Sequence, residues 1–459
     1  MVNIKNTENL LKNARSSLDR KARELAINAL NASLEAVDPK AIIHSQVKVK
    51  DNTLKIGNLS FNLDKFKNIF VVGGGKASGC MAEALEELLG ERIKEGIINV
   101  PYACPPSQTR KIKLHHASHP IPDISGVKGA SQMLYLVSQA EENDLIICLL
   151  SGGGSSLMPQ PCSGVSLQDK RKVTDALLKS GATINEINTV RKHISGFKGG
   201  WLAKRAYPAT VVNLILSDVV GDPLDSIASG PTVPDPTTFH DAIEILKIYR
   251  LWDKVPSSVK KVLSNGQKGL VLETPKPSDK VFTKVQNVVV GNNRTASLAA
   301  YSNFKKAGLN ALLLSSCLEG QARDVGTMLA SIATEIAVCR NPVPKPAGMV
   351  AGGETTVTVV GKGKGGRNQE IVLGATLKMG ATDGVVVASI STDGVDGPTD
   401  VAGAIADGKT LLRSKELGLN PRRFLEENDS YSFFSKLNDV ILTGSTGTNV
   451  NDVSVIVVL

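Results

Sequence analysis

Aromatic residues and cysteines are both scarce in this chain of 459 residues. The aromatic share of 4% leaves few side chains on which nucleic-acid bases could stack. The six cysteines form no CxxC pair and follow no regular spacing, which argues against a disulfide framework and against the common zinc motifs. No apolar run approaches the roughly 18 residues of a membrane-spanning helix. These absences favour a globular protein with reduced thiols and without membrane or nucleic-acid partners.

The chain also lacks an excess of acidic residues, because 53 lysines and arginines against 44 aspartates and glutamates give a net charge of +9. The basic residues are spread over the whole length, which is as typical of a solvated surface as of an anion-binding protein. A basic nucleic-acid binder would rest on this charge alone, since no recognition motif is present. The N-terminal stretch lacks the apolar core of a signal peptide, and Glu8, Asp19 and Glu24 argue against a transit peptide. We therefore expect a cytoplasmic location.

Short apolar runs that stop at small or polar residues recur along the chain, for example IFVVGGGK, LIICLLSGGGSS, VVNLILSDVVGD and VVVASISTDG. Such runs, alternating with helical segments, are typical of parallel strands covered by helices on both faces. The sequence therefore predicts an α/β fold with largely parallel, Rossmann-like sheets, whose ligands lie beyond the carboxyl ends of the strands. A Lys-, Pro- and Ser-rich segment between residues 253 and 283 predicts a boundary between an N-terminal domain, 1–265, and a C-terminal domain, 266–459.

The segment VVGGGKASG follows one of these predicted strands and precedes a helical pattern. Gly73, Gly74 and Gly75 would let backbone N–H groups approach an anion near the helix N-terminus, and Lys76 adds a mobile positive charge. A dinucleotide-binding turn would require an acid about 20 residues further on, at the end of the next strand. That strand, GIINV, is followed by PYA, which contains no acid. Anion binding and plain close packing both stay open for this loop.

A second glycine-rich loop, LLSGGGSS, repeats this design without a lysine. Glycines allow a close approach of the backbone to a ligand, and serine hydroxyls donate hydrogen bonds. The residues concerned are Ser151, Gly152, Gly153, Gly154, Ser155 and Ser156. Two such loops in consecutive strand–helix units favour a shared anionic ligand.

Charged residues near later strand ends extend this set. Arg191 is suited to gripping a carboxylate through two parallel hydrogen bonds, although a single arginine is more typical of a surface salt bridge. Asp218 stands two residues past a predicted strand, with Asp222 and Asp225 in the same loop. Acids in that position serve as magnesium ligands or bases, or else as turn formers beside the neighbouring glycine and proline.

The C-terminal half contains a comparable set of polar residues. Glu354 directly follows a strand-end glycine pair, while Arg367 and Asn368 open a helical segment. Asp393 and Asp396 lie in STDGVDG, which resembles a calcium loop only superficially because the twelfth position is not glutamate. The three histidines of HHASHPIPD lack the organised spacing of zinc ligands and favour a structural or surface role.

Together these loops supply backbone donors, cations for an anion, and several acids for a metal or a base. That combination is typical of phosphoryl transfer, in which catalysis consists mainly of positioning and charge neutralisation. The chain also resembles the type II glycerate kinases, or MOFRL family. The resemblance rests on motifs that run in family order from about residue 69 to the C-terminus: GKASGCMAEALEELLG, LLSGGGSSL, LLKSGATINEINTVRKHISGFKGG, LSDVVGDPLDSIASGPTVPDPTTF, GGETTV, GRNQE, TDGVDGPTDVAGA and TGSTGTNVND.

The resemblance implies two α/β domains with the active site in the cleft between them, and ATP-dependent phosphorylation of D-glycerate, mostly to 2-phosphoglycerate. ATP and Mg²⁺ are the implied cofactors, and a monomer or homodimer is expected. Lys76, Asp218, Arg367 and Asp393 match positions of the family's active site. Gln321 stands where relatives commonly have glutamate, so a metal-binding role for that position is in doubt.

Within this framework we assign roles to the remaining candidates. The substrate would contact Arg191, Ser151, Gly153, Ser155 and Asn368, and the nucleotide would contact Gly73, Gly74, Gly75, Gly152, Gly154 and Ser156. Asp218 and Glu354 are the candidate magnesium ligands.

Lys76 would neutralise charge on the transferring phosphoryl group, and Asp393 or Asp218 would accept the hydroxyl proton. The alternative enzyme is an NAD(P)H-dependent hydroxypyruvate or tartronate-semialdehyde reductase, against which the missing ribose-binding acid counts.

Overall fold

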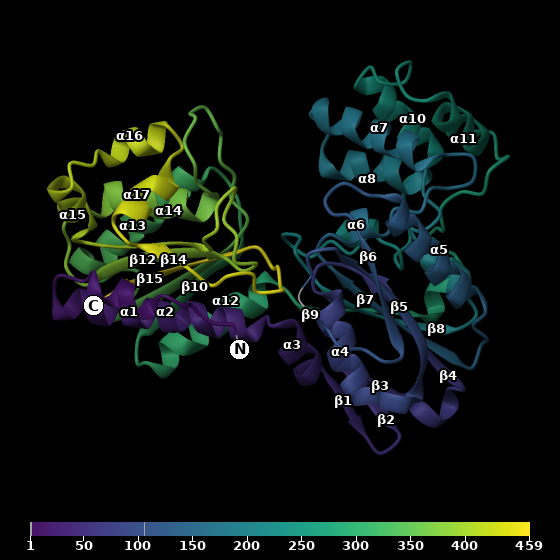
Figure 1. Cartoon of the computed structure of the whole chain (residues 1–459), viewed down its shortest axis with the longest axis horizontal. Helices are drawn as coiled ribbons and strands as arrows, with labels where there is room; N and C mark the ends of the chain where they lie inside the picture. The colour runs from purple at the N-terminus through teal and green to yellow at the C-terminus, as the bar shows by residue number, and fades with distance from the viewer. Residues whose placement is uncertain (1, 105) are drawn as a thin grey trace. The chain divides into compact units, whose positions relative to one another are not determined.

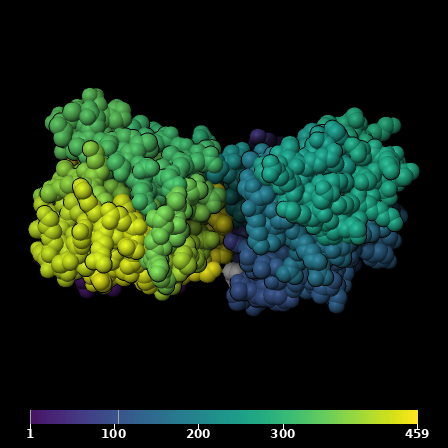
Figure 2. Space-filling view, turned by 90° about the horizontal axis from the view of Figure 1, so that it is seen from above, coloured from purple at the N-terminus to yellow at the C-terminus, as the bar shows by residue number. Residues whose placement is uncertain are grey.

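The computed structural model describes residues 2–104 and 106–459, and its chain forms two compact units. The first, Ile42–Val290, is called the 42–290 unit. The second, the 291–459 unit, joins Gly291–Leu459 to the N-terminal segment that ends at Ala41. In Figure 1 and Figure 2 the blue and teal residues belong to the first unit, and the green and yellow residues to the second.

A six-stranded sheet with the order β6-β5-β4-β7-β8-β9 forms the centre of the 42–290 unit. Its strands are β4 (Asn68–Gly74), β5 (Ile93–Pro101), β6 (Ile112–Ala117), β7 (Asp144–Ser151), β8 (Thr210–Leu216) and β9 (Val285–Gly291). The pairs β4–β5, β5–β6, β4–β7 and β7–β8 are parallel, as the apolar runs predict. From β4 the chain adds β5 and β6 on one side and then β7 and β8 on the other. The order therefore reverses between β4 and β7, and ligands of open α/β sheets bind at such a switch point.

Helices pack on this sheet and form a further layer beside it. The helices that pack on the sheet are α4 (Ser78–Leu89), α5 (Ile124–Ser138), α6 (Gly154–Leu157) and α9 (Trp201–Ala206). Met133 and Leu202, from α5 and α9, share one apolar cluster with Phe70 and Val72 of β4. The further layer contains α7 (Leu167–Lys179), α8 (Ile184–His193), α10 (Phe239–Ile248) and α11 (Ser257–Gln267), which surround a second cluster and lie together in Figure 1. Helix α3 (Pro39–Gln46) precedes a small antiparallel sheet of β1 (Val47–Lys50), β2 (Thr53–Ile56) and β3 (Leu59–Asn62).

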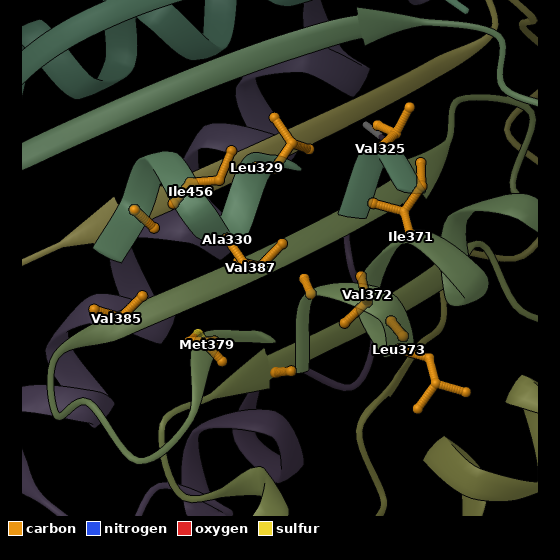
Figure 3. Packing of buried hydrophobic residues seen from close by; sticks show 14 of the residues in the cluster. Val325, Leu329, Ala330, Ile371, Val372, Leu373, Met379, Val385, Val387 and Ile456 are labelled. Atoms are coloured by element: carbon orange, nitrogen blue, oxygen red, sulfur yellow. The ribbon is translucent and has the colours of Figure 1, made fainter. Parts of the chain in front are cut away.

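The 291–459 unit contains another six-stranded sheet, with the order β10-β11-β15-β12-β13-β14. Its strands are β10 (Asn310–Leu318), β11 (Ala347–Gly353), β12 (Val385–Ser391), β13 (Gly403–Asp407), β14 (Val440–Ile441) and β15 (Asp452–Val458). Its helices are α1 (Thr7–Lys12), α2 (Ser17–Ala36), α12 (Asn293–Lys306), α13 (Ala322–Cys339), α14 (Arg367–Met379), α15 (Thr410–Glu416), α16 (Pro421–Glu426) and α17 (Ser430–Lys436). Figure 3 shows Leu329 of α13 and Val372 of α14 in one core with Val387 of β12 and Ile456 of β15.

The prediction of largely parallel sheets is wrong for this second unit. Strand β15 is antiparallel to both of its neighbours, β11 and β12, and β13 is antiparallel to β12 and β14, whereas β10 and β11 are parallel. The run DVSVIVV is buried at all seven positions because α2 and α12 contact β15 as well as α13. Burial on both faces produces a continuous apolar run whatever the direction of the neighbouring strands.

The structural units also differ from the predicted division at residues 265 and 266. Strand β9 joins the sheet of the 42–290 unit, and α2 packs on β12, β15 and α12 of the 291–459 unit. The Lys-, Pro- and Ser-rich segment that suggested the boundary contains α11, whose Val259 and Leu263 belong to the core of the first unit. Composition marks an exposed segment, but it does not reveal with which sheet the next strand forms hydrogen bonds.

In the described part of the chain, no helix is both long enough and apolar enough to cross a membrane.

Candidate active site

The two glycine-rich loops of the 42–290 unit form one surface, because β4 and β7 are neighbours and Gly74 pairs with Leu150. The Lys76 N–H donates to the Gly152 carbonyl at 2.8 Å, and the Ala77 N–H donates to Ser151 Oγ at 3.0 Å. A Cβ atom on Gly75, whose φ is +156°, would lie 2.1 Å from Ser151 Oγ. Only glycine allows this approach of the two loops.

This loop contact uses several groups that the sequence assigns to ligands. Ser151 is 2% exposed and its hydroxyl is occupied by Ala77 and Ser78. Gly73 and Gly74 belong to strand β4, and the Gly75 N–H donates to the Asn99 carbonyl at 3.1 Å. In this structure these residues hold the two loops together, which favours the packing role that the sequence left open for Gly73 to Gly75.

Lys76, Asp218 and His119 surround the turn at residues 152–154. A Cβ on Gly152 would lie 2.2 Å from Asp218 Oδ2, and a Cβ on Gly153 would lie 2.8 Å from the His119 ring and 3.5 Å from Lys76 Cγ. Burial, and then the charge of Lys76, lower the pKa of His119, so its ring favours the neutral form. Sequence reasoning treated His119 only as one of three clustered histidines. Its position just after β6, at the edge where the glycine loops emerge, was the missed signal.

A hydrogen-bonded chain connects Arg191 to the second glycine loop. Arg191 Nη1 donates to Asn188 Oδ1 at 3.4 Å, and Ser229 Oγ donates to the same oxygen at 3.1 Å. Ser229 Oγ in turn lies 2.8 Å from Ser155 Oγ. Burial lowers the pKa of Arg191 to about 10. The structure thus brings Arg191 and Ser155 together, through two residues that the sequence did not single out.

Lys198 approaches the same loop from the turn that precedes α9. Its Nζ donates to the Ser155 carbonyl at 2.8 Å and its side chain is nearly inaccessible, with 1% exposed. Ser156, next in the loop, donates its hydroxyl to the Gly153 carbonyl at 3.0 Å. Gly154 is buried against the Gly74 carbonyl and Ala228 Cβ. Lys198 lies in the SGFKGG stretch quoted for the sequence motif, but nothing in the sequence distinguished it from other lysines.

Arg367 of the 291–459 unit is already paired with two acids. Its Nη1 lies 2.8 Å from Glu354 Oε1, and its Nε and Nη2 lie 2.5 and 3.1 Å from the two oxygens of Asp452. Burial raises the pKa of Asp452 to about 7 despite the nearby guanidinium. Asp452 did not appear among the sequence candidates, because its aspartate begins an otherwise apolar strand.

The side chain of Asn368 lies in the core of the 291–459 unit. It is fully buried, its Nδ2 donates to Asp396 Oδ1 at 3.1 Å, and its Oδ1 accepts from Ser389 Oγ at 2.6 Å. Asp396 also accepts the N–H groups of Asn368 and Gln369 at 3.0 and 2.9 Å, so its carboxylate occupies the N-terminus of α14. Asn368 therefore connects the start of α14 to β12, and its substrate contact stays a prediction.

Asp393 lies in the loop after β12 and is partly buried. Its Oδ1 accepts hydrogen bonds from Ser391 Oγ at 2.9 Å and from the Val395 N–H at 3.0 Å. The Thr446 N–H donates to its carbonyl at 3.3 Å, which ties this loop to the loop before β15.

A cavity of about 580 Å³ adjoins Arg367 and Glu354. Its lining includes Glu319, Glu370 and the glycines that precede α14. Gln321 lies close in sequence, and its side chain donates to Thr358 Oγ1 at 2.6 Å and accepts from the Thr358 N–H at 3.2 Å. In this chain Gln321 thus anchors the segment around Thr358.

No group of three or more His, Cys, Asp or Glu side chains within residues 2–104 and 106–459 could hold a metal ion. The two candidate ligands, Asp218 and Glu354, belong to different units, and Glu354 pairs with Arg367. Mg²⁺ commonly binds through one or two carboxylates plus substrate phosphates and water, so a single acid beside a bound nucleotide still fits that ion.

Known proteins resemble this chain over almost its whole length. Residues 25–264 match a family described as a domain of unknown function, DUF4147, and residues 347–452 match the MOFRL family. A protein of Pyrococcus horikoshii named glycerate 2-kinase is 42% identical, over 95% of this chain and 97% of its own. The chain belongs to the MOFRL family of glycerate kinases. Within that family, the crystal structure of a Thermotoga maritima glycerate kinase has a TM-score of 0.86 at 41% identity, covering 95% of this chain and 99% of its own.

Another relative carries a different name. A protein of Agrobacterium vitis named putative hydroxypyruvate reductase is 38% identical, over 96% of this chain and 95% of its own length. The names of the relatives therefore include two activities, glycerate kinase and hydroxypyruvate reductase.

Proposed function

We propose that this protein transfers the γ-phosphoryl group of ATP to D-glycerate and forms mainly 2-phosphoglycerate. The observation that carries the proposal is the arrangement of Lys76 and Asp218 around the 152–154 turn, at the switch point of the parallel sheet. A cation and a carboxylate at one ligand-binding edge are the groups that phosphoryl transfer requires. The names of the Pyrococcus and Thermotoga relatives support the same reaction.

Each group has a definite task in this reaction. Bound MgATP would supply the phosphoryl group and neutralise part of its charge. Lys76 neutralises further charge on the transferring group, and Asp218 accepts the proton of the glycerate hydroxyl, with Asp393 as the alternative base. Amides and hydroxyls of Gly152 to Ser156 orient the two substrates. Arg367 is a further candidate for catalysis, and Glu354 is a further candidate ligand of Mg²⁺.

The product and two variants test this proposal. We expect ADP release that depends on D-glycerate, and a proton-coupled ³¹P spectrum in which the product signal is a doublet, because the 2-ester places one hydrogen on the adjoining carbon. A triplet would assign the 3-hydroxyl instead. Replacing Lys76 by Ala or Asp218 by Asn should lower kcat by about 10²-fold or more, since each removes a group that acts in the transition state.

The exposed Lys113 provides the matched control, and K113A should keep wild-type turnover. Equal turnover of K76A, D218N and K113A would contradict the assignment of these residues. Absence of any phosphorylated product from the wild-type protein would contradict the reaction itself.

The name of the Agrobacterium relative favours a second candidate, an NAD(P)H-dependent reductase of hydroxypyruvate or tartronate semialdehyde. The described strand β5 ends at Pro101 and is followed by Tyr102, so the position expected for a ribose-binding acid holds none. Fluorescence titration with NADH separates the two: saturable binding with hydroxypyruvate-dependent oxidation supports the reductase, and no binding supports the kinase.

We further propose that the protein acts in the cytoplasm on small molecules, as a monomer or a homodimer. Light scattering of the purified protein with and without nucleotide measures the assembly, and a tetramer or larger species would contradict it.

A further inference from the structure

Three cations of the 42–290 unit, Lys170, Arg191 and Lys198, have only neutral partners. Lys198 Nζ donates to the carbonyls of Ser155 and Ala228 at 2.8 and 3.4 Å. In the same unit, Lys170 Nζ donates to two backbone carbonyls at 3.2 Å each, while Arg191 donates to the Asn188 amide oxygen. Among the described residues, Asp225 and Asp235 pair with Lys192, and no carboxylate pairs with any of these three cations.

An uncompensated buried charge is costly, so proteins usually pair it. Lys170 is 5% exposed and Lys198 is 1% exposed. Burial, followed by the charge of Arg191, lowers the pKa of Lys170 to about 7. Burial, followed by the charges of Arg191 and Lys170, lowers the pKa of Lys198 well below its usual range. Hydrogen bonds place two of these cations around one loop: Lys198 contacts the Ser155 carbonyl, and Ser155 Oγ is linked through Ser229 and Asn188 to Arg191.

A strained backbone segment holds this group against the second glycine loop. Ala228, Ser229 and Gly230 adopt φ values of +50°, +60° and +61° in succession. The left-handed region costs a residue with a side chain roughly 1–2 kcal/mol. The segment directs the Ala228 carbonyl to Lys198, and it places Ser229 Oγ between Ser155 and Asn188. Strain of this kind persists where the surrounding structure requires one arrangement, which is common at ligand-binding sites.

We propose that Lys198 and Arg191 bind the carboxylate of the acceptor substrate beside Ser155, with Lys170 adding to the positive potential behind them. This assignment rests on the proposed function, because it takes the acceptor to be a hydroxy acid. The substrate carboxylate supplies the acidic partner that none of the three cations has among the described residues. The same site makes the enzyme reject polyols, since glycerol carries the hydroxyls of glycerate without its carboxylate.

The test compares Lys198→Met with wild type. Methionine keeps most of the side-chain length and removes the charge, so we expect the KM for D-glycerate to rise by roughly 10- to 100-fold, the usual effect of losing a hydrogen bond to a charged group. The KM for ATP should stay within about twofold, because the transferring phosphates contact Lys76 rather than Lys198. Lys172→Met, an exposed residue of α7 in the same unit, is the matched control and should change neither constant.

Calorimetric titration of D-glycerate into the protein without nucleotide gives a second readout. Wild type and K172M should bind it, K198M should bind it weakly, and Lys198→Arg should recover part of the affinity. Tartronate, a dicarboxylate, should compete with glycerate, whereas glycerol should not. Thermal melting shows whether K198M is folded; if it is not, the competition experiment on wild type still tests the carboxylate requirement.

Two results would overturn the inference. A rise in the KM for ATP with an unchanged KM for glycerate would assign the site to a nucleotide phosphate. Unchanged constants for both substrates in a folded K198M would assign Lys198 to the scaffold. Failure of the proposed function is distinguishable, because the wild-type protein would then release no ADP with D-glycerate.

Discussion

Buried cations occur in both units of this protein, but their surroundings differ. In the 291–459 unit, Arg23 is fully buried, with its Nε 2.6 Å from Asp407 Oδ2 and its Nη1 2.8 Å from Asp439 Oδ1. Arg413 also pairs with Asp439. In the 42–290 unit, Arg191 meets an asparagine oxygen and no carboxylate among the residues described.

Burial of a charge is therefore not by itself a sign of a ligand site. The two arginines around Asp439 are compensated by two aspartates, which ties helix α2 to the sheet and serves the fold. The cations near Ser155 lack such compensation, and the remaining charge is what an anionic substrate can provide. Charge balance, rather than depth, separates the structural region from the candidate binding region.

The largest effect is expected at Asp439. In Asp439→Asn the two arginines lose one of their carboxylates inside the core, so the free energy of unfolding of this unit should fall by about 3–5 kcal/mol. Chemical denaturation followed by circular dichroism measures the loss. An unfolding midpoint like that of wild type would show that the cluster does not stabilise the fold.

Arg191 should behave in the opposite way. Arg191→Met removes a charge that has no acidic partner, so the free energy of unfolding should stay within about 1 kcal/mol of wild type or increase. The KM for D-glycerate should nevertheless rise, since the substrate carboxylate loses its partner. Thermal melts without substrate measure the stability, and steady-state kinetics with varied D-glycerate measure the KM. A clear loss of stability in the absence of substrate would make Arg191 a scaffold residue like Arg23.

A pH effect of smaller size is expected from Lys170, whose folded pKa of about 7 lies below its usual 10.5. Between these values the unfolded chain holds a proton that the folded chain has released, so stability from this group increases as the pH rises through that window. Below about pH 7 both states carry the proton and the burial penalty is complete. Thermal melts between pH 6 and pH 10 should show that wild type gains stability relative to Lys170→Met. A constant difference between the two proteins would contradict the lowered pKa.

The smallest effect is expected for the exposed pair of Arg15 and Glu416, whose atoms lie 2.9 Å apart. Glu416→Gln should change the free energy of unfolding by about 0.5 kcal/mol or less, because water and salt screen the pair. It is the control for Asp439→Asn, with the same loss of one carboxylate in the same unit. An equal loss in the free energy of unfolding for Glu416→Gln and Asp439→Asn would contradict the expectation that the buried pair stabilises the fold more than the exposed pair does.

Much of the candidate site was visible in the sequence because it lies in continuous motifs. The two glycine loops, Lys76 and Asp218 all follow apolar runs, and parallel pairing brings the ends of such runs to one edge. Lys198 and Asn188 gave no signal, because a lysine in a turn or an asparagine in a helix has the same appearance in the sequence whether it is exposed or buried. The predicted substrate contact of Asn368 stays a prediction: its neighbour Arg367 is partly exposed, while Asn368 itself is buried in the core.

The sequence by itself determined the α/β class, the strand-end loops and the family, since these depend on local periodicity and on ordered motifs. Three features follow only from the folded chain: the direction of β15, the packing of α2 against the C-terminal strands, and the pairing of buried cations with acids. Those features depend on residues hundreds of positions apart, such as Arg23 and Asp439. Local patterns report how deeply a segment is buried, but only the folded chain determines which charges are buried together.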